Sequence, residues 1–194
     1  MSEKRVIVIA GPSGSGKNTI ISRLLKLIPD STRLVTATTR ERRPGEEDRD
    51  DYYFFDTERF DDEVGLGHIA GQRFVALQGG VHYGIYLPDL QKRLQHYHTI
   101  FAPVDLTGAE FLKEKYHALT IFIVPEAFSE YRLRIRSRSP EMSEKEFNMR
   151  MKIADQEMRV HAPKYDYRVV NAGGTLERTV QEVMEIIRKE GYTR

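Results

Sequence analysis

Near its N-terminus the chain reads VIVIAGPSGSGKNTII, residues 6–21. Val6–Ala10 is a continuous apolar run of mostly β-branched residues, which predicts a strand buried on both faces. After the glycine-rich turn, Thr19–Ile28 carries apolar residues at helical spacing, which predicts an amphipathic helix. A strand, a glycine-rich turn and a helix in this order indicate the start of a parallel α/β sheet.

The turn, residues 11–17, satisfies the pattern G-x-x-x-x-G-K. Glycines let successive main-chain N–H groups turn toward phosphate oxygens, the helix N-terminus adds a favourable dipole, and the lysine reaches the β- and γ-phosphates. We therefore predict an ATP site of the P-loop type rather than an ordinary Gly/Ser turn. Its predicted ATP-binding residues are Gly11, Ser13, Gly14, Ser15, Gly16, Lys17, Asn18 and Thr19.

The metal side of this loop departs from the strict pattern at one place. Asn18 stands where a serine or threonine usually offers its hydroxyl to magnesium, and Thr19 follows one place later. ATP brings Mg²⁺ with its phosphates, so the metal is expected as a cofactor together with ATP. Thr19 is the candidate metal contact, and Asn18 stays open as the alternative. A dinucleotide fingerprint fits poorly, because Thr19 also stands where a third small residue is wanted.

The rest of the chain continues the α/β pattern. Further strands are predicted at Leu34–Thr38, Ile100–Leu106, Leu119–Val124 and Tyr167–Val170. Further helices are predicted at Asp89–His98, Phe128–Arg136, Lys145–Arg159 and Thr175–Glu190. Residues 42–86 are rich in Asp, Arg, Gly and aromatics, and they predict a small insert of mixed or antiparallel strands. The fold class is therefore α/β, with a parallel five-stranded sheet flanked by helices.

Bulk composition narrows the class of protein. With 194 residues, 40% apolar and 30% charged, the chain is expected to form one globular domain. Thirty basic and 29 acidic side chains give a net charge of +1, which argues against a general polyanion binder. The absence of cysteine excludes disulfides and thiolate zinc sites. The apolar run at residues 6–10 is shorter than the roughly 7–15 residues of a signal-peptide core. We therefore expect a cytoplasmic monomer or homodimer without nucleic-acid or membrane partners.

A second block, TATTRERRPGE at residues 36–46 followed by Asp51-Tyr52, resembles the monophosphate-binding segment of the guanylate kinase family. That segment reads T-T-R-x-x-R-x-G-E and is followed by a D-Y pair. The resemblance implies that the acceptor is held by Thr36, Arg40, Arg43, Tyr52, Tyr83 and Asp105. Two guanidinium forks and a phenol suit a dianionic phosphate. The alternative is a solvated basic loop with salt bridges to Glu46, Glu47 and Asp48.

The resemblance extends over almost the whole chain. Arg134 and Arg138, four residues apart, match the family's lid arginines, Arg150 matches a third arginine near both phosphates, and Asn171 matches an adenine-side position. The resemblance implies that the negative charge on the transferred phosphoryl group is neutralised by Lys17, Arg134, Arg138 and Arg150. The reaction needs no general base.

The implied architecture is a P-loop NTPase fold with an acceptor-binding insert and a helical lid. One guanylate-kinase-like domain would span residues 1–194. Its core would comprise residues 1–35, 98–126 and 160–194, with the insert at 36–88 and the lid at about 127–159.

The base-binding segment departs from the family. Guanylate kinases place a glutamate about nine residues before the tyrosine of a Y-G pair, here Tyr83-Gly84, and counting back reaches Phe74 or Ala76. Ile85 replaces the serine that follows that pair, and residues 64–88 contain no Asp or Glu. Asp105 can still accept from a guanine amine, and two side chains are candidate substitutes for the glutamate, namely Gln72 and Gln78.

Three functions therefore stay open. The first is ATP-dependent phosphoryl transfer to a nucleoside monophosphate, GMP or dGMP, giving GDP or dGDP. The second is a related kinase of another phosphorylated acceptor, such as ribose 1,5-bisphosphate or a different nucleotide. The third is a non-catalytic binding module, against which the intact Lys17 and loop glycines argue.

Overall fold

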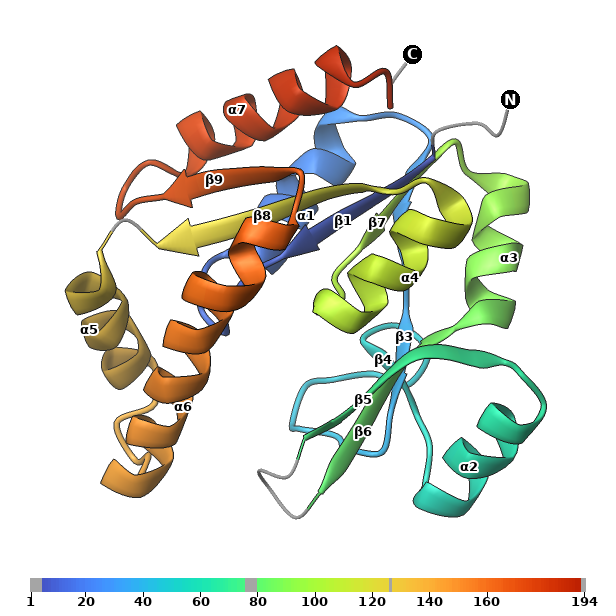
Figure 1. Cartoon of the computed structure of the whole chain (residues 1–194), viewed down its shortest axis with the longest axis horizontal. Coiled ribbons are helices and arrows are strands. Elements are labelled where there is room, and N and C mark those ends of the chain that lie inside the picture. The colour runs from blue at the N-terminus through green and yellow to red at the C-terminus, as the bar shows by residue number, and fades with distance from the viewer. Residues whose placement is uncertain (1–4, 76–79, 126, 193–194) are drawn as a thin grey trace. The chain divides into compact units, whose positions relative to one another are not determined.

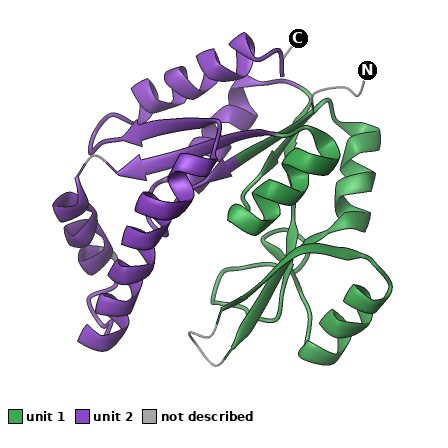
Figure 2. Cartoon of the chain, viewed as in Figure 1, with its two compact units in different colours: residues 1–8, 30–118 green, residues 9–29, 119–194 purple. Residues whose placement is uncertain are grey.

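The computed structural model describes residues 5–75, 80–125 and 127–192 (Figure 1). The chain divides into two compact units, residues 1–8 with 30–118 and residues 9–29 with 119–194 (Figure 2). A five-stranded sheet has the order β2-β7-β1-β8-β9, and a four-stranded sheet has the order β4-β3-β6-β5. The strands of the larger sheet are β1 (Val6–Ala10), β2 (Ser31–Arg33), β7 (Thr99–Ala102), β8 (Leu119–Pro125) and β9 (Tyr167–Asn171).

The larger sheet confirms the predicted α/β class. Its β1–β7, β2–β7 and β8–β9 pairs are parallel. All five residues of β1 are at most 2% exposed, as the unbroken apolar run predicted for a strand covered on both faces.

The prediction of one strand at Leu34–Thr38 was wrong. The sheet strand lies earlier, as β2, while β3 (Thr36–Thr38) belongs to the four-stranded sheet. The N–H of Leu34 still donates to the carbonyl of Phe101 in β7, but the N–H of Val35 leaves the ladder and donates to the carboxylate of Asp89. The apolar pattern runs on through this crossing because Leu34 and Val35 are both buried.

The predicted strand at Ile100–Leu106 was also too long. The strand ends at Ala102, and Asp105 caps a helix that was not predicted, α4 (Leu106–Tyr116), by accepting from the N–H of Gly108 at 3.1 Å. A second unpredicted helix, α2 (Thr57–Gly65), begins after Asp56, which accepts from the N–H of Arg59 at 2.8 Å. Both are aspartate N-caps, a local signal that apolar periodicity does not contain.

The first unit holds the four-stranded sheet and confirms the predicted insert of mixed strands. Its other strands are β4 (Tyr52–Phe54), β5 (Ile69–Val75) and β6 (Val81–Tyr86), followed by helix α3 (Leu87–His96). β3 pairs in parallel with β4 and antiparallel with β6. Helix α2 lies against β5 and buries Phe60 in a small core with Ala37, Phe55 and Ile69.

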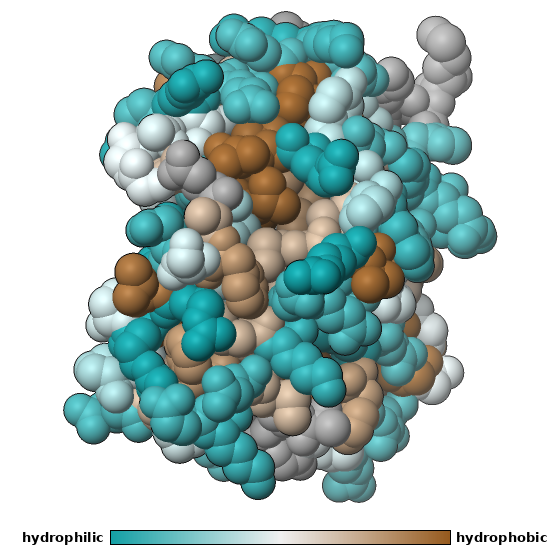
Figure 3. Space-filling model, turned by 60° about the vertical axis from the view of Figure 1, so that its left-hand side comes forward, coloured by the Kyte–Doolittle hydropathy of each residue, from teal (hydrophilic) through white to brown (hydrophobic). Residues whose placement is uncertain are grey.

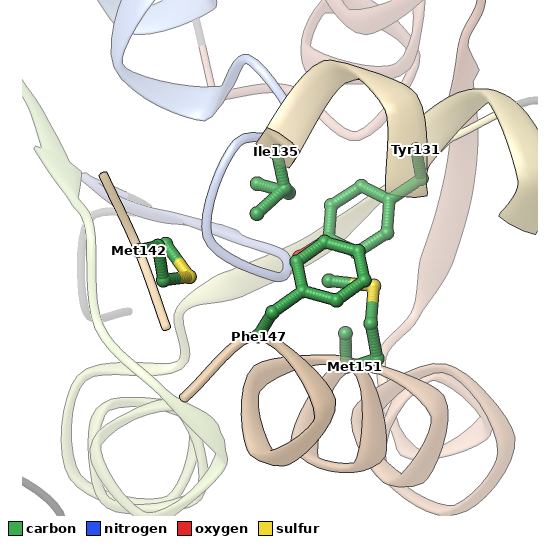
Figure 4. Packing of buried hydrophobic residues seen from close by; sticks show 6 residues of the cluster. Tyr131, Ile135, Met142, Phe147 and Met151 are labelled. Carbon is green, nitrogen blue, oxygen red and sulfur yellow. The ribbon is translucent and has the colours of Figure 1, made fainter. Parts of the chain in front are cut away.

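In the second unit, helix α1 (Lys17–Leu27) follows the glycine-rich turn, and helix α7 (Leu176–Lys189) packs against both α1 and β9. The remaining helices are α5 (Phe128–Arg138) and α6 (Glu144–Gln156), followed by a π-helical turn at Glu157–His161 and a 3₁₀ turn at Ala162–Lys164. The predicted helix Lys145–Arg159 thus changes its winding near its end. Tyr131 and Ile135 of α5 point toward Phe147 and Met151 of α6, which holds the two helices together (Figure 4).

The surface is mostly hydrophilic on the face shown in Figure 3, with apolar groups between polar ones. Several large apolar side chains remain exposed and come from separate elements: Leu27, Leu66, Phe74, Tyr97, Leu133, Met149, Val160 and Val170. No helix in the described part of the chain is long and apolar enough to span a membrane.

A buried carboxylate joins the crossing between the sheets to α3. Asp89 is 4% exposed, accepts from the N–H of Val35 and from the hydroxyl of Tyr53, each at 3.1 Å, and pairs with Arg93. Arg93 in turn donates to Thr32 of β2 at 2.6 Å. One side chain therefore satisfies the main-chain N–H group at the point where the chain changes sheets.

We expect Asp89→Ala to lower the free energy of unfolding by about 3–5 kcal/mol, because it leaves the Arg93 guanidinium and the Val35 N–H without a buried acceptor. Urea denaturation at neutral pH measures this. The control is Asp61→Ala on the exposed side of α2, expected within about 0.5 kcal/mol of the parent. A loss below about 1 kcal/mol for Asp89→Ala would contradict the assignment.

Candidate functional site

The glycine-rich loop takes a backbone conformation that only glycine adopts easily. Gly11, Gly14 and Gly16 have φ values of 147°, 89° and 93°. A Cβ on Gly11 would lie 2.5 Å from the carbonyl oxygen of Ile123, and one on Gly14 would lie 2.5 Å from Cδ1 of Ile135. The loop therefore packs directly against β8 and α5. A side chain at Gly11 is excluded by space as well as by φ, while one at Gly14 would have to displace the end of the Ile135 side chain.

Two side chains hold the loop by its carbonyl oxygens. Tyr131 of α5 donates its hydroxyl to the carbonyl of Ser13 at 2.7 Å. Asn171, at the end of β9, donates Nδ2 to the carbonyl of Ser15 at 2.8 Å, and its Oδ1 accepts from Thr179 at 3.2 Å. Lys17 Nζ lies 3.4 Å from the carbonyl of Pro12. The loop is thus fixed by side chains from two other segments of the same unit.

The predicted role of Asn171 at the adenine stays a prediction. Its side chain is 6% exposed and oriented by Thr179, so in this structure it supports the loop. A Cβ on Gly16 would lie 2.3 Å from its Nδ2. Sequence reasoning did not detect this supporting role, because the two residues are 155 positions apart and no local pattern links them.

One polar atom of the loop fits a bound phosphate. Ser15 is fully buried, and its Oγ has no hydrogen-bond partner within the described parts of the chain. A buried polar atom left unsatisfied costs about 1–3 kcal/mol. An anionic oxygen brought into the loop would satisfy this hydroxyl, so the residues present are compatible with a nucleotide phosphate.

The residues of the predicted metal contact lie in the first turn of α1. Lys17 begins the helix and is half-buried, while Asn18 and Thr19 are exposed. Among the described residues there is no group of three or more His, Asp or Glu side chains that could hold a metal ion. Thr19 as the Mg²⁺ contact, with Asn18 as the alternative, stays a prediction.

The predicted lid arginines lie on the two helices joined by the core in Figure 4. Arg134 is half-buried on α5, and Arg138 ends the same helix, with its side chain outside the described atoms. Arg150 on α6 donates to Glu146 at 2.9 Å. All three belong to the second unit, as the glycine-rich loop does.

The predicted acceptor segment belongs to the first unit and is organised by Glu46. Arg40, 8% exposed, donates Nη2 to both carboxylate oxygens of Glu46 at 2.7 and 2.9 Å. Glu46 also accepts from the main-chain N–H of Arg43 at 2.9 Å, while the Arg43 side chain is exposed. The expected salt bridge to Glu46 is therefore present, and it orients Arg40 rather than leaving it in solvent.

Charges and phenols cluster around Arg40. Its guanidinium carbon lies 5.4 Å from the Tyr52 ring centroid, and the rings of Tyr52 and Tyr83 are 6.2 Å apart. Burial by itself lowers the pKa of Arg40, but the hydrogen bonds and charge of Glu46 raise this pKa overall. The bond from Arg40 lowers the pKa of Glu46, and burial followed by the nearby Tyr83 raises the pKa of Tyr52.

Sheet register places three of the predicted acceptor residues on one face. Thr36 pairs with Tyr52, and Thr38, two residues further along β3, pairs with Tyr83. Residues paired across strands, and residues two apart along one strand, point to the same face of a sheet. Thr36, Tyr52 and Tyr83 therefore share one face, beside Arg40.

Asp105 lies in the same unit as these residues. Its Oδ1 caps α4, and its Oδ2 accepts from Nη1 of Arg73 at 3.3 Å. Sequence reasoning did not single out Arg73. It pairs with Tyr83 across the β5–β6 ladder and therefore stands on the face of the predicted phosphate-binding residues.

Phe74, reached by counting back from Tyr83, lies on the other face of the sheet. It pairs with His82, whose ring centroid is 5.0 Å away, and it is 59% exposed. Counting along the chain does not give the pairing of β5 with β6, which sets Arg73 rather than Phe74 opposite Tyr83. Gln72 is exposed there, Ile85 is buried, and the alternatives Ala76 and Gln78 lie outside the described residues.

The model of the guanylate kinase family matches residues 3–190. The chain belongs to the guanylate kinase family. It is accordingly a nucleoside-monophosphate kinase, which is a phosphotransferase. The predicted family, fold class and enzyme class are confirmed.

Known guanylate kinases are similar to this chain along nearly its whole length. Guanylate kinase of Prochlorococcus marinus subsp. pastoris is 33% identical over 186 residues, covering 95% of this chain and 97% of that protein. Guanylate kinase of Mannheimia succiniciproducens is 31% identical and covers 100% of this chain and 91% of its own length. The crystal structure of guanylate kinase from Anaplasma phagocytophilum superposes with a TM-score of 0.69 at 26% identity, covering 98% and 87% of the two chains.

We expect Gly16→Ala to lower the free energy of unfolding by about 2–3 kcal/mol, since its Cβ must displace Asn171 and the backbone is strained. ATP affinity should fall at least tenfold. Urea denaturation and calorimetric titration measure the two effects.

The matched control is Gly174→Ala. Gly174 also has a positive φ, 75°, but its Cβ would meet nothing within 4 Å. The free energy of unfolding of that variant should be lower by about 1 kcal/mol, and its ATP affinity should be unchanged. Equal behaviour of the two variants would show that Asn171 does not support the loop.

A pH dependence follows from the buried tyrosines. Burial, then the charge of Glu157, raises the pKa of Tyr131 to about 12, above its unfolded value of about 10. Its contribution to stability is therefore fully present below pH 10 and is lost as pH rises through 12. Burial and Asp89 raise the pKa of Tyr53 to about 12 as well.

We expect Tyr131→Phe to reduce the fall in unfolding free energy between pH 10 and 12. Tyr53→Phe should reduce it independently, and the double variant should do so more than either single change. At neutral pH, Tyr131→Phe should cost about 1 kcal/mol, because the Ser13 carbonyl loses a donor. Denaturant titrations at several pH values measure the unfolding free energy. If its slope against pH between 10 and 12 is the same in Tyr131→Phe as in the parent, the prediction is wrong.

Proposed function

We propose that the protein transfers the γ-phosphoryl group of ATP to GMP or dGMP, releasing ADP and GDP or dGDP. The observation that carries the proposal is the family match over residues 3–190 together with an intact glycine-rich loop and its lysine. The relatives from Prochlorococcus and Mannheimia are both described as guanylate kinases, which supports this acceptor.

On the donor side, the loop at residues 11–17 would bind the ATP phosphates, with Ser15 as one hydroxyl donor. Lys17 would reach the transferred phosphoryl group, and Arg134, Arg138 and Arg150 would add positive charge from the lid. Mg²⁺ enters with ATP and, when bound, neutralises charge on the β- and γ-phosphates. Thr19 or Asn18 would contact it.

On the acceptor side, Arg40 would bind the monophosphate together with Tyr52 and Tyr83. A guanidinium carries five N–H donors, so Arg40 can keep its bonds to Glu46 and still donate to a phosphate. Glu46 orients Arg40 before the substrate arrives, which reduces the entropy lost on binding. Arg43 and Thr36 complete the set, Arg43 from an exposed position that lets it follow the ligand.

The acceptor phosphate oxygen is already anionic at neutral pH and needs no base to activate it. Catalysis therefore consists of positioning and of neutralising charge on the transferred group. Residues 36–88 would form the acceptor insert and residues 127–159 the lid of one guanylate-kinase-like domain.

Two observations favour another phosphorylated acceptor, such as a different nucleotide or ribose 1,5-bisphosphate. Ile85 follows the Tyr83-Gly84 pair, and residues 64–88 contain no carboxylate side chain. A coupled assay with GMP, dGMP, AMP, CMP, UMP and ribose 1,5-bisphosphate separates the two proposals. GMP or dGMP should give the highest kcat/KM.

We expect Lys17→Ala to lower kcat at least a hundredfold with the best acceptor, because it removes a charge aimed at the transferred group. Lys26→Ala, on an exposed position of the same helix, should leave kcat unchanged. The coupled assay measures both variants. Full activity of Lys17→Ala, or turnover that no acceptor raises, would refute the proposal.

A further inference from the structure

We propose that Arg73 is a specificity-determining residue of the acceptor site. Its guanidinium donates to the carbonyl oxygen of a 6-oxopurine base, while the neighbouring Asp105 accepts from the N–H groups of the same base. The inference rests on the proposed function, because it takes the acceptor to be a purine nucleoside monophosphate.

The first support is the face on which Arg73 stands. Arg73 pairs with Tyr83, and the Tyr83 ring contacts that of Tyr52 beside Arg40. Strand β5 is the second strand from β3 in the order β4-β3-β6-β5. With strands about 4.8 Å apart, this places β5 about 10 Å from the strand that precedes Arg40. A nucleotide with its phosphate at Arg40 can extend its base along this face toward Arg73.

The second support is the way the backbone aims Arg73 at Asp105. The β5–β6 register is irregular between Ala70 and Arg73, and such irregularities redirect the following side chain. Gly71, within it, has a φ of 56°, and a Cβ there would lie 2.9 Å from Cα of Gly108 in the first turn of α4. Strand β5 therefore touches the turn that Asp105 caps, and Arg73 and Asp105 are brought together by main-chain contact.

The third support is the state of the ion pair. The Arg73 and Asp105 side chains are 31% and 25% exposed, and the Nη1–Oδ2 distance is 3.3 Å, long for a charge-assisted bond. Oδ1 of Asp105 is held by the N–H of Gly108. The pair is half-buried and loosely closed, so a ligand can reach both a donor and an acceptor.

A donor beside an acceptor matches one edge of guanine. Guanine presents the O6 acceptor next to the N1–H and N2–H donors, and a guanidinium is the commonest protein partner of O6. Adenine carries an amine donor in place of O6, which would face the Arg73 donors and leave both without a partner. Sites built on hydrogen bonds discriminate strongly against such a mismatch. Recognition of guanine by Arg73 and Asp105 therefore does not require a carboxylate on β5 or β6.

The test measures KM and kcat with GMP, IMP and AMP in the parent and in Arg73→Gln. IMP keeps O6 and N1–H but lacks the 2-amine. We expect KM for GMP and for IMP to rise about tenfold to a hundredfold. The GMP/AMP ratio of kcat/KM should fall at least tenfold, and KM for ATP should stay unchanged. Arg168→Gln, an exposed arginine of β9, is the matched control and should change none of these values.

Arg73→Lys serves as a second variant, because it keeps the charge near Asp105 but removes the planar fork. It should retain the parent's melting temperature and lose part of the GMP/AMP discrimination, because an ammonium can still donate to O6 but lacks the planar geometry of the guanidinium. A lower melting temperature with unchanged discrimination in both variants would show that Arg73 only ties β5 to α4. An equal rise in KM for GMP, IMP and AMP would place Arg73 at the phosphate. Either result overturns the inference.

Failure of the proposed function has a separate signature. It would appear in the parent protein, as absence of turnover with GMP, before any variant is compared. Parent activity with GMP combined with unaltered selectivity of the Arg73 variants would reject this inference alone.

Discussion

The conformation of the glycine-rich loop depends on support from outside it, above all on the hydrogen bond from Asn171 Nδ2 to the carbonyl oxygen of Ser15. A loop of glycines has no conformation of its own, since each glycine reaches left-handed and right-handed φ values at similar cost. Asn171, oriented by Thr179 and packed against Gly16, selects one of these conformations. The main-chain groups are thereby arranged without a ligand, so the proposed binding of ATP would not consume binding energy in ordering them.

Tyr131 connects this loop to the predicted lid. Its hydroxyl bonds the carbonyl of Ser13, while its ring belongs to the core shared by α5 and α6. Helix α5 carries Arg134 and α6 carries Arg150. The loop and the arginines proposed to act on the same phosphoryl group are therefore supported by one side chain within one unit. In the other unit, Glu46 does for Arg40 what Asn171 does for the loop, because it orients a group before the ligand is present.

Sequence patterns predicted the parts of the structure that depend on local spacing. The buried strand at Val6–Ala10, the loop after it and most helices of the second unit were predicted correctly, because period and turn composition are local properties. The strand at Leu34–Thr38 was wrong because apolar residues continue through a change of sheet, where Asp89 satisfies the freed N–H group. Helix α4 was missed because its start is signalled by the Asp105 cap rather than by periodicity.

The candidate site shows the same division. The sequence by itself determined where the candidate phosphate-binding residues stand, since these follow from residue type and motif spacing along the chain: Lys17 with its glycines, and Arg40 with Tyr52. Only the tertiary structure decided that Arg73 rather than Phe74 stands on the face of Tyr83, beside Asp105. The reason is physical: a side chain's face in a strand alternates with every residue, so a one-residue difference in how β5 pairs with β6 reverses it, and that pairing is not encoded in local spacing.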